Sequence, residues 1–188
     1  MNWSPWMILL ISLIALAGIV ILLYPAFQSV LTALREEKAV TVFMDEKEEL
    51  TWEGSAEEDI LREACEDYNS ILRPTPIESE LEDKPDIFDN KTCFAVLRIP
   101  CLKMVMPVYL GASSENLERG AAVIGGTSLP IGGESTCSVI AGHRSWSGSI
   151  RFRPIEDLEP GDTVFIENRW EILRYRVESV KIIEACDI

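Results

Sequence analysis

Two neighbouring segments decide the fold of this 188-residue chain: Gly125-Gly-Thr-Ser-Leu-Pro-Ile-Gly-Gly133 and, four residues later, Ser138-Val-Ile-Ala-Gly-His-Arg144. Glycine pairs at both ends of the first segment are signals of tight turns. The second segment begins with the short apolar run 138–141, which is typical of a short strand. The one histidine of the chain, His143, follows that run almost directly.

The residues on both sides of these segments predict a β-rich region over residues 93–188. Further strands are expected at 94–99, 103–110, 163–166 and 173–177, and one short helical turn at 113–119. Pro107 places its strand at a sheet edge or a bulge. Leu173, Tyr175 and Val177 alternate with charged residues, which predicts a strand with one buried face. Short strands at this spacing favour a closed or partly closed antiparallel barrel.

The N-terminal part of the chain predicts a membrane helix. Residues 1–34 carry no charged side chain, and the apolar run 6–24 is long enough to cross the hydrocarbon core of a bilayer. We expect residues 1–25 to form a transmembrane anchor through which residues 6–24 contact the lipid bilayer, and Pro25 to interrupt the helix. A cleaved signal peptide is the alternative, but a basic start and a small-residue cleavage site are not evident. Charge alone does not give the orientation.

Residues 26–92 are expected to form an acidic connector. Between Arg35 and Thr92 there are 19 acidic and 7 basic residues. Ser55 and Glu58 fit a capping box, and residues 55–73 predict an amphipathic helix that ends before Pro74. The apolar stripe of that helix consists of Ile60, Leu61, Ala64, Cys65, Tyr68, Ile71 and Leu72.

The composition argues against several classes of function. The formal net charge of −14 disfavours nucleic acid as a partner. A single histidine excludes zinc sites built on two or more histidines, and the chain has no Asp-rich loop with calcium-binding spacing. We therefore expect no metal and no cofactor.

Four ordered motifs resemble the sortase family, which consists of cysteine transpeptidases on the outside of Gram-positive cells. They are Leu97-Arg-Ile-Pro100, Met106-Pro-Val-Tyr109 and the two segments quoted first, and Leu158-Glu-Pro-Gly-Asp162 and Tyr175-Arg-Val177 support them. The Gly-Thr-Ser-Leu-Pro-Ile-Gly-Gly run most resembles class C, the pilin-polymerising sortases. The fold implied is mainly β, an incomplete sortase-type barrel with short helices, after a transmembrane helix and an acidic helical connector.

The resemblance also implies a chemistry and a location. His143 would exchange a proton with the leaving and the incoming amine, after a cysteine thiolate attacks a sorting signal in a surface protein or pilin. The acyl group would pass to a pilin lysine or to a cell-wall precursor. Thr127, Ser128 and Leu129 would shape the floor of the cleft. The chain would be a single-pass membrane protein with its β-domain outside the cell.

The family's nucleophile motif, Thr-Leu-x-Thr-Cys, and the arginine that follows it do not occur in the 188 residues. Cys137 is six residues from His143, which is too far along an extended strand for a hydrogen bond. Cys65, Cys93, Cys101 and Cys137 are expected to be buried small residues. We expect residues 93–188 to be the N-terminal portion of the barrel of a longer sortase.

Three alternatives remain open at this stage. A catalytically inactive sortase-like protein would bind or act as a scaffold at the cell surface, and a housekeeping or class B-like enzyme is a second possibility. An unrelated β-domain would require four chance matches in order. Within the connector, Pro85-Asp86-Ile87-Phe88 approximates the family's Asp-Pro-aromatic lid, with Asp86 and Phe88 as candidate lid residues.

Overall fold

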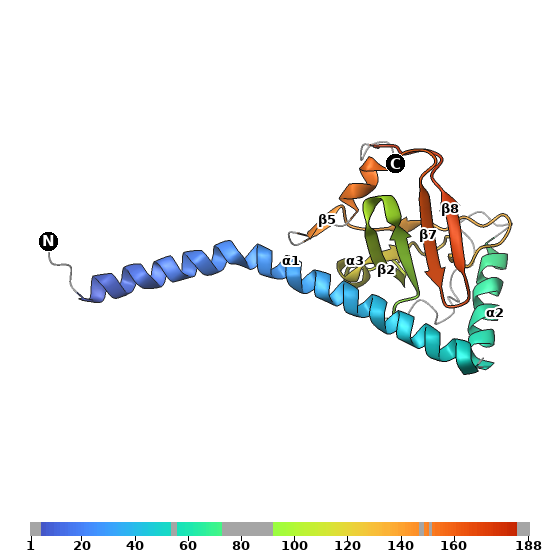
Figure 1. The fold of residues 1–188 in the computed structure, drawn as a ribbon, viewed down its shortest axis with the longest axis horizontal. Helices are drawn as coiled ribbons and strands as arrows, with labels where there is room; N and C mark the ends of the chain where they lie inside the picture. The colour runs from blue at the N-terminus through green and yellow to red at the C-terminus, as the bar shows by residue number, and fades with distance from the viewer. Residues whose placement is uncertain (1–4, 54–55, 73–91, 147–148, 151, 184–188) are drawn as a thin grey trace.

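One curled sheet forms the centre of the computed structural model, which describes residues 5–53, 56–72, 92–146, 149–150 and 152–183 (Figure 1). Among these residues, six strands pair in the order β4-β3-β2-β1-β7-β8. The strands are β1 (Ala95–Ile99), β2 (Met104–Leu110), β3 (Ala121–Val123), β4 (Ile140–Ala141), β7 (Thr163–Asn168) and β8 (Ile172–Arg176). A small hairpin joins β5 (Ser145–Trp146) to β6 (Ser149–Ile150).

The helices are α1 (Pro5–Glu53), α2 (Ala56–Ile71) and α3 (Ser114–Arg119), with 3-10 turns at Pro100–Leu102 and Arg153–Asp157. The predicted strands and the predicted turn at 113–119 are confirmed, although β4 is shorter and β7 longer than expected. The sheet is open rather than closed, in agreement with the incomplete barrel that the sequence predicted.

The sheet differs from the expectation at β2 and β3. Strand β3 was not predicted, and it pairs parallel with β2, whereas the other pairs are antiparallel. Strand β2 lies between β1 and β3 and is not an edge strand of the sheet, but at Pro107 only its side toward β1 is paired. Pairing with β3 begins only at Val108. Pro107, which lacks an N–H, is therefore tolerated just before that ladder.

The strand register gives the sheet two different faces. Ala95, Leu97 and Ile99 lie opposite Val108, Met106 and Met104 and form the core face. Val96 and Arg98 point to the other face, because successive side chains alternate along a strand. On that other face Glu167 lies opposite Val96.

Helix α1 is longer than the sequence predicted. The expectation that Pro25 interrupts the helix is wrong, because α1 continues through it to Glu53. Proline in a helix interior costs about 3 kcal/mol and bends the helix. Figure 1 shows α1 bent part-way along, with its N-terminal part projecting from the domain. Packing of the C-terminal half against the sheet offsets that cost.

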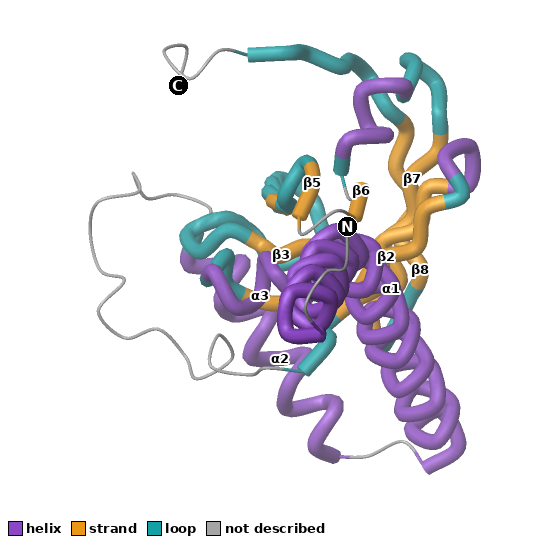
Figure 2. Tube along the Cα trace, turned by 90° about the vertical axis from the view of Figure 1, so that its left-hand side faces the viewer, coloured by secondary structure: helices purple, strands orange, loops and turns teal. Residues whose placement is uncertain are grey.

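Phe43 and a cluster of charges attach α1 to the sheet. The side chain of Phe43 is 2% exposed. Lys47 Nζ and Arg98 Nε each lie 3.1 Å from the carboxylate of Glu167, and Arg169 pairs with Glu46 at 3.1 Å. Because Glu167 is almost buried, its charge requires these cationic partners. Figures 1 and 2 show α1 crossing the sheet beside β2, in agreement with its contacts to β2, β6 and α3.

Helix α2 confirms the predicted amphipathic helix, but its buried stripe is narrower than predicted. Cys65, Tyr68 and Asn69 are buried, and Leu61 and Leu72 are half-buried against the core. Ile60 and Ile71 were expected in the stripe but are 65% and 67% exposed. The helix therefore contacts the sheet through one narrow line of residues.

Two further expectations about burial are wrong. Tyr175 is 44% exposed, because the face of β8 that carries Leu173 and Tyr175 lines an open cavity. Cys101 and Cys137 are exposed rather than buried, whereas Cys65 is buried as expected and Cys93 is half-buried. Cys101 lies in the turn after β1, and Cys137 lies in the loop before β4.

The carboxyl group of Glu167 gives a prediction about pH. Burial raises its pKa, but hydrogen bonds and charge from Lys47 and Arg98 outweigh burial, so the pKa lies below its ordinary value of 4.5. A lowered carboxyl pKa stabilises the fold above the ordinary value, and that stability is lost as the pH falls through the lowered pKa. We expect Glu167→Gln to show a weaker loss of stability between about pH 5 and pH 3 than the wild type.

The measurement is urea unfolding of both proteins at several pH values, followed by circular dichroism. Glu63→Gln, on the exposed surface of α2, is the matched control and should keep the wild-type pH dependence. Parallel stability curves for Glu167→Gln and the wild type would contradict the role given to this carboxylate.

Candidate functional site

His143 lies two residues after the end of β4, in the short segment of chain that connects β4 to the β5–β6 hairpin. Strand β4 is held by β3, with Ala122 opposite Ala141 and Val123 opposite Ile140. The backbone N–H of Phe152 donates to the carbonyl of His143 at 3.1 Å. The histidine is half-buried. Backbone bonds on both sides therefore fix the position of the segment that carries it.

A cavity of about 550 Å³ opens on the core face of the sheet, next to the histidine-bearing segment. Ser138 and Ile140 contribute to it from that segment, and Phe152 from the residues after the hairpin. The rest of its apolar wall consists of Leu97, Leu129, Pro130, Ile155, Leu158, Val164, Ile166 and Leu173. The cavity is thus an apolar groove with few polar groups, which is the usual composition of a ligand site.

The three predicted floor residues have different positions. Leu129 is 1% exposed and lines the cavity. Thr127 and Ser128 do not line it. Instead, the Thr127 hydroxyl accepts from the N–H of Val139 at 3.2 Å and donates to the Ile124 carbonyl at 2.7 Å. Their roles as binding residues remain predictions.

Ser128 is bonded twice to Cys137. Its N–H donates to the Cys137 carbonyl at 2.9 Å, and its hydroxyl accepts from the Cys137 N–H at 3.1 Å. The loop 124–129 is therefore connected to the residues that lead into β4.

Helix α2 holds the same loop from the other side, a contact that the sequence did not predict. The amide of Asn69 bonds both the N–H and the carbonyl of Leu129, and the Tyr68 hydroxyl accepts from the Gly126 N–H at 3.1 Å. The sequence feature that could have indicated this contact is Asn69, a polar residue beside the apolar stripe of the helix.

The described cysteines do not lie in the cavity wall. Burial, and next the charge of Glu66, raises the pKa of the Cys65 thiol to about 12. Burial is also the largest cause that raises the pKa of Cys93 to about 11. High pKa values disfavour the thiolate that a nucleophile needs. Cys186 and the lid candidates Asp86 and Phe88 lie outside the described residues.

Arg144 forms an ion pair with Glu156. Its guanidinium forms two hydrogen bonds to the carboxylate of Glu156, the longer at 3.1 Å. This contact raises the pKa of Arg144 and lowers that of Glu156. The pair joins the segment after β4 to the turn Arg153–Asp157, which favours a structural role for Arg144.

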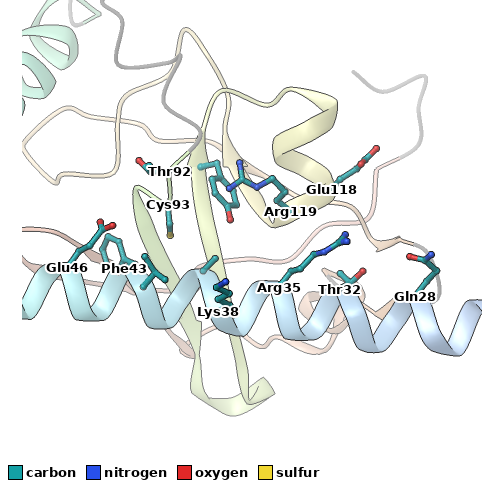
Figure 3. Close-up of a pocket in the computed structure, with 13 residues that line it drawn as sticks. Gln28, Thr32, Arg35, Lys38, Phe43, Glu46, Thr92, Cys93, Glu118 and Arg119 are labelled. Carbon is teal, nitrogen blue, oxygen red and sulfur yellow. The ribbon is translucent and has the colours of Figure 1, made fainter.

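A second groove, of about 520 Å³, lies between α1 and the sheet (Figure 3). Arg35 and Lys38 of α1 face it, together with Arg119, whose guanidinium lies 4.4 Å from the Tyr109 ring centroid. Glu46 and Glu118 also line it, so charges of both signs meet there. This mixture of positive and negative side chains favours neither an anionic nor a cationic ligand.

The sortase domain family matches residues 97–188 of this chain. Sortase SrtE1 of Streptomyces coelicolor is 34% identical over 104 residues, which cover 51% of this chain and 28% of that protein. Sortase C-1 of Streptococcus pneumoniae is 29% identical with a TM-score of 0.65, covering 78% of each chain. Sortase C of Clostridium perfringens is 28% identical with a TM-score of 0.63, covering 77% of each chain.

Close packing next to His143 gives a prediction. A Cβ atom on Gly142 would lie 2.7 Å from the ring of Phe152, so that ring has to move. Because the added methyl group displaces the Phe152 ring from its packed position, we expect Gly142→Ala to lower the free energy of unfolding by about 1–3 kcal/mol. The measurement is urea unfolding followed by tryptophan fluorescence.

Gly125→Ala is the matched control, because a Cβ there meets nothing within 4 Å. Its stability should stay within about 0.5 kcal/mol of the wild type. Equal stability of both variants and the wild type would show that Phe152 does not pack tightly on Gly142.

Proposed function

Residues 97–188 belong to the sortase family, and from this premise we propose that the protein is a membrane-anchored, sortase-like cysteine transpeptidase. It cleaves a sorting signal in a surface protein or pilin and joins the acyl group to an amine. The observation that carries the proposal is the place of His143 within the family's ordered motifs, two residues after the end of β4. Ser138 and Ile140 of the same segment line the apolar cavity, whereas His143 itself does not. No cofactor is needed for this reaction.

In the proposed reaction a cysteine thiolate attacks the carbonyl of the scissile peptide bond. Protonated His143 gives its proton to the leaving amine, and a thioester remains. Neutral His143 then takes a proton from the incoming amine, which attacks the thioester and releases the thiolate. The 188 residues contain no Thr-Leu-x-Thr-Cys motif, so only the role of the histidine is assigned to a residue.

The substrate and acceptor are also part of the proposal. Several solved relatives are named sortase C or pilus-related sortase, which favours a pilin sorting signal as the substrate. The acceptor amine is then a pilin lysine, with a cell-wall precursor as the housekeeping or class B-like alternative.

Helix α1 supports the proposed membrane anchor. It is the one helix among the described residues that is long and apolar enough to cross a membrane. Its uncharged part, residues 5–34, extends about 45 Å at about 1.5 Å per residue. That exceeds a hydrocarbon core of roughly 30 Å. We propose a single pass through residues 6–24, with the β-domain outside the cell.

A second candidate function is a catalytically inactive sortase-like protein that binds its partner at the cell surface. The observation in its favour is that the described cysteines lie away from the cavity wall. Such a protein would bind a sorting signal in the cavity without cleaving it.

The test is transpeptidation by the whole gene product in nanodiscs, with fluorescent sorting-signal peptides and an amine acceptor. We expect a joined product, and a loss of about 10²–10⁴-fold in His143→Ala, the range for a general acid–base group. Arg62→Ala, which removes an exposed ion pair on α2, should keep the wild-type rate.

Two results would decide against the transpeptidase. Peptide binding without any joined or cleaved product would favour the inactive binding protein. Turnover that is unchanged in a folded His143→Ala variant would remove the histidine from the mechanism.

A further inference from the structure

Asn69 is a buried polar residue with a specific arrangement of hydrogen bonds. Its side chain is 3% exposed. The N–H of Leu129 donates to Asn69 Oδ1 at 2.7 Å, and Asn69 Nδ2 donates to the Leu129 carbonyl at 3.1 Å. The carboxamide thus pairs with the backbone of Leu129 as a neighbouring strand would. Only a side chain with both a donor and an acceptor satisfies both groups.

Tyr68 adds a bond to the same loop three residues earlier. Its ring is 4% exposed in the core, and its hydroxyl accepts from the N–H of Gly126 at 3.1 Å. Two adjacent residues of α2 therefore bind the loop 124–129 at Gly126 and at Leu129. Buried backbone groups that lose such partners cost about 1–3 kcal/mol each.

The loop 124–129 is in turn hydrogen-bonded to the segment that carries the histidine. The N–H of Ile124 donates to the Val139 carbonyl at 2.8 Å, and the Thr127 hydroxyl accepts from the Val139 N–H. Ser128 makes its two bonds to Cys137. Residues 137–139 continue through β4 to His143. A continuous set of hydrogen bonds thus runs from α2, through the loop, to the residues before the histidine.

We propose that Tyr68 and Asn69 are positioning residues for His143, and that α2 acts on the site through the loop 124–129. The inference rests on the proposed function for the importance of His143, but the contacts themselves do not depend on it. Leu129 is held by Asn69 and lines the cavity, so the same contacts also fix one wall of the groove. Helix α2 is then part of the site's support and not only a connector.

His143 is the single histidine of the 188 residues, so its resonance in that chain is assigned directly. The full chain, with ¹³C-labelled histidine, is reconstituted in nanodiscs, and the Cε1–H resonance of His143 is recorded by NMR. Three variants are compared: Asn69→Leu, which removes both bonds to Leu129; Tyr68→Phe, which removes the hydroxyl that accepts from Gly126; and Ser70→Ala. Ser70 is the matched control, because its exposed hydroxyl donates to the backbone carbonyl of Asp67 in the same helix.

We expect the His143 resonance to shift or broaden beyond its linewidth in Asn69→Leu, less in Tyr68→Phe, and not in Ser70→Ala. Amide exchange at Leu129 should accelerate on the order of tenfold in Asn69→Leu, because its N–H loses a buried partner. Asn69→Asp keeps the acceptor and should restore part of the protection at Leu129.

Wild-type resonances for His143 in folded Asn69→Leu and Tyr68→Phe would overturn the proposal, even if both variants were less stable. Should Asn69→Leu not fold, Tyr68→Phe alone decides, since it deletes one hydroxyl. The readout needs no catalytic activity. A failure of the transpeptidation test with shifted His143 resonances would therefore overturn the proposed function and leave the positioning role standing.

Discussion

Strand β1 is paired along both of its edges, to β2 through residues 95–99 and to β7 through residues 95–98. The rest of the domain depends on this two-sided pairing, because it fixes which side chains face each side of the sheet. Leu97 and its neighbours at alternate positions face the core and the cavity. Arg98 faces α1 instead and meets Glu167 there. A register slip of one residue would exchange the two faces.

On each face of the sheet a helix is held in place through a buried polar group. On the outer face, Glu167 joins Lys47 of α1 to Arg98 of the sheet. On the side of the cavity, Asn69 of α2 pairs with the backbone of Leu129. Apolar contacts supply most of the burial, but a buried polar group has few acceptable partners, so it specifies one position. Helix α1 is thereby fixed to β1 and β7, and α2 to the loop 124–129, which bonds to the residues before the histidine.

The elements predictable from the sequence were those with a strong local pattern. Strands β1, β2 and β7 have clear apolar runs, and α2 has a helical apolar period. Strand β3 was missed because Ala-Ala-Val is too short to show a period. The helix through Pro25 was missed because packing of α1, which is tertiary, outweighs a local helix breaker. His143 was located by its motif, whereas the role of Asn69 depends on a partner 60 residues away.

The proposed function requires that the protein forms a thioester with a sorting signal. The most direct measurement is the intact mass of the whole gene product after brief reaction with a sorting-signal peptide and acid quench. We expect an added mass equal to the acyl part of the peptide, sensitive to hydroxylamine and lost in His143→Ala. A folded protein that binds the peptide but never gains this mass would contradict the claim.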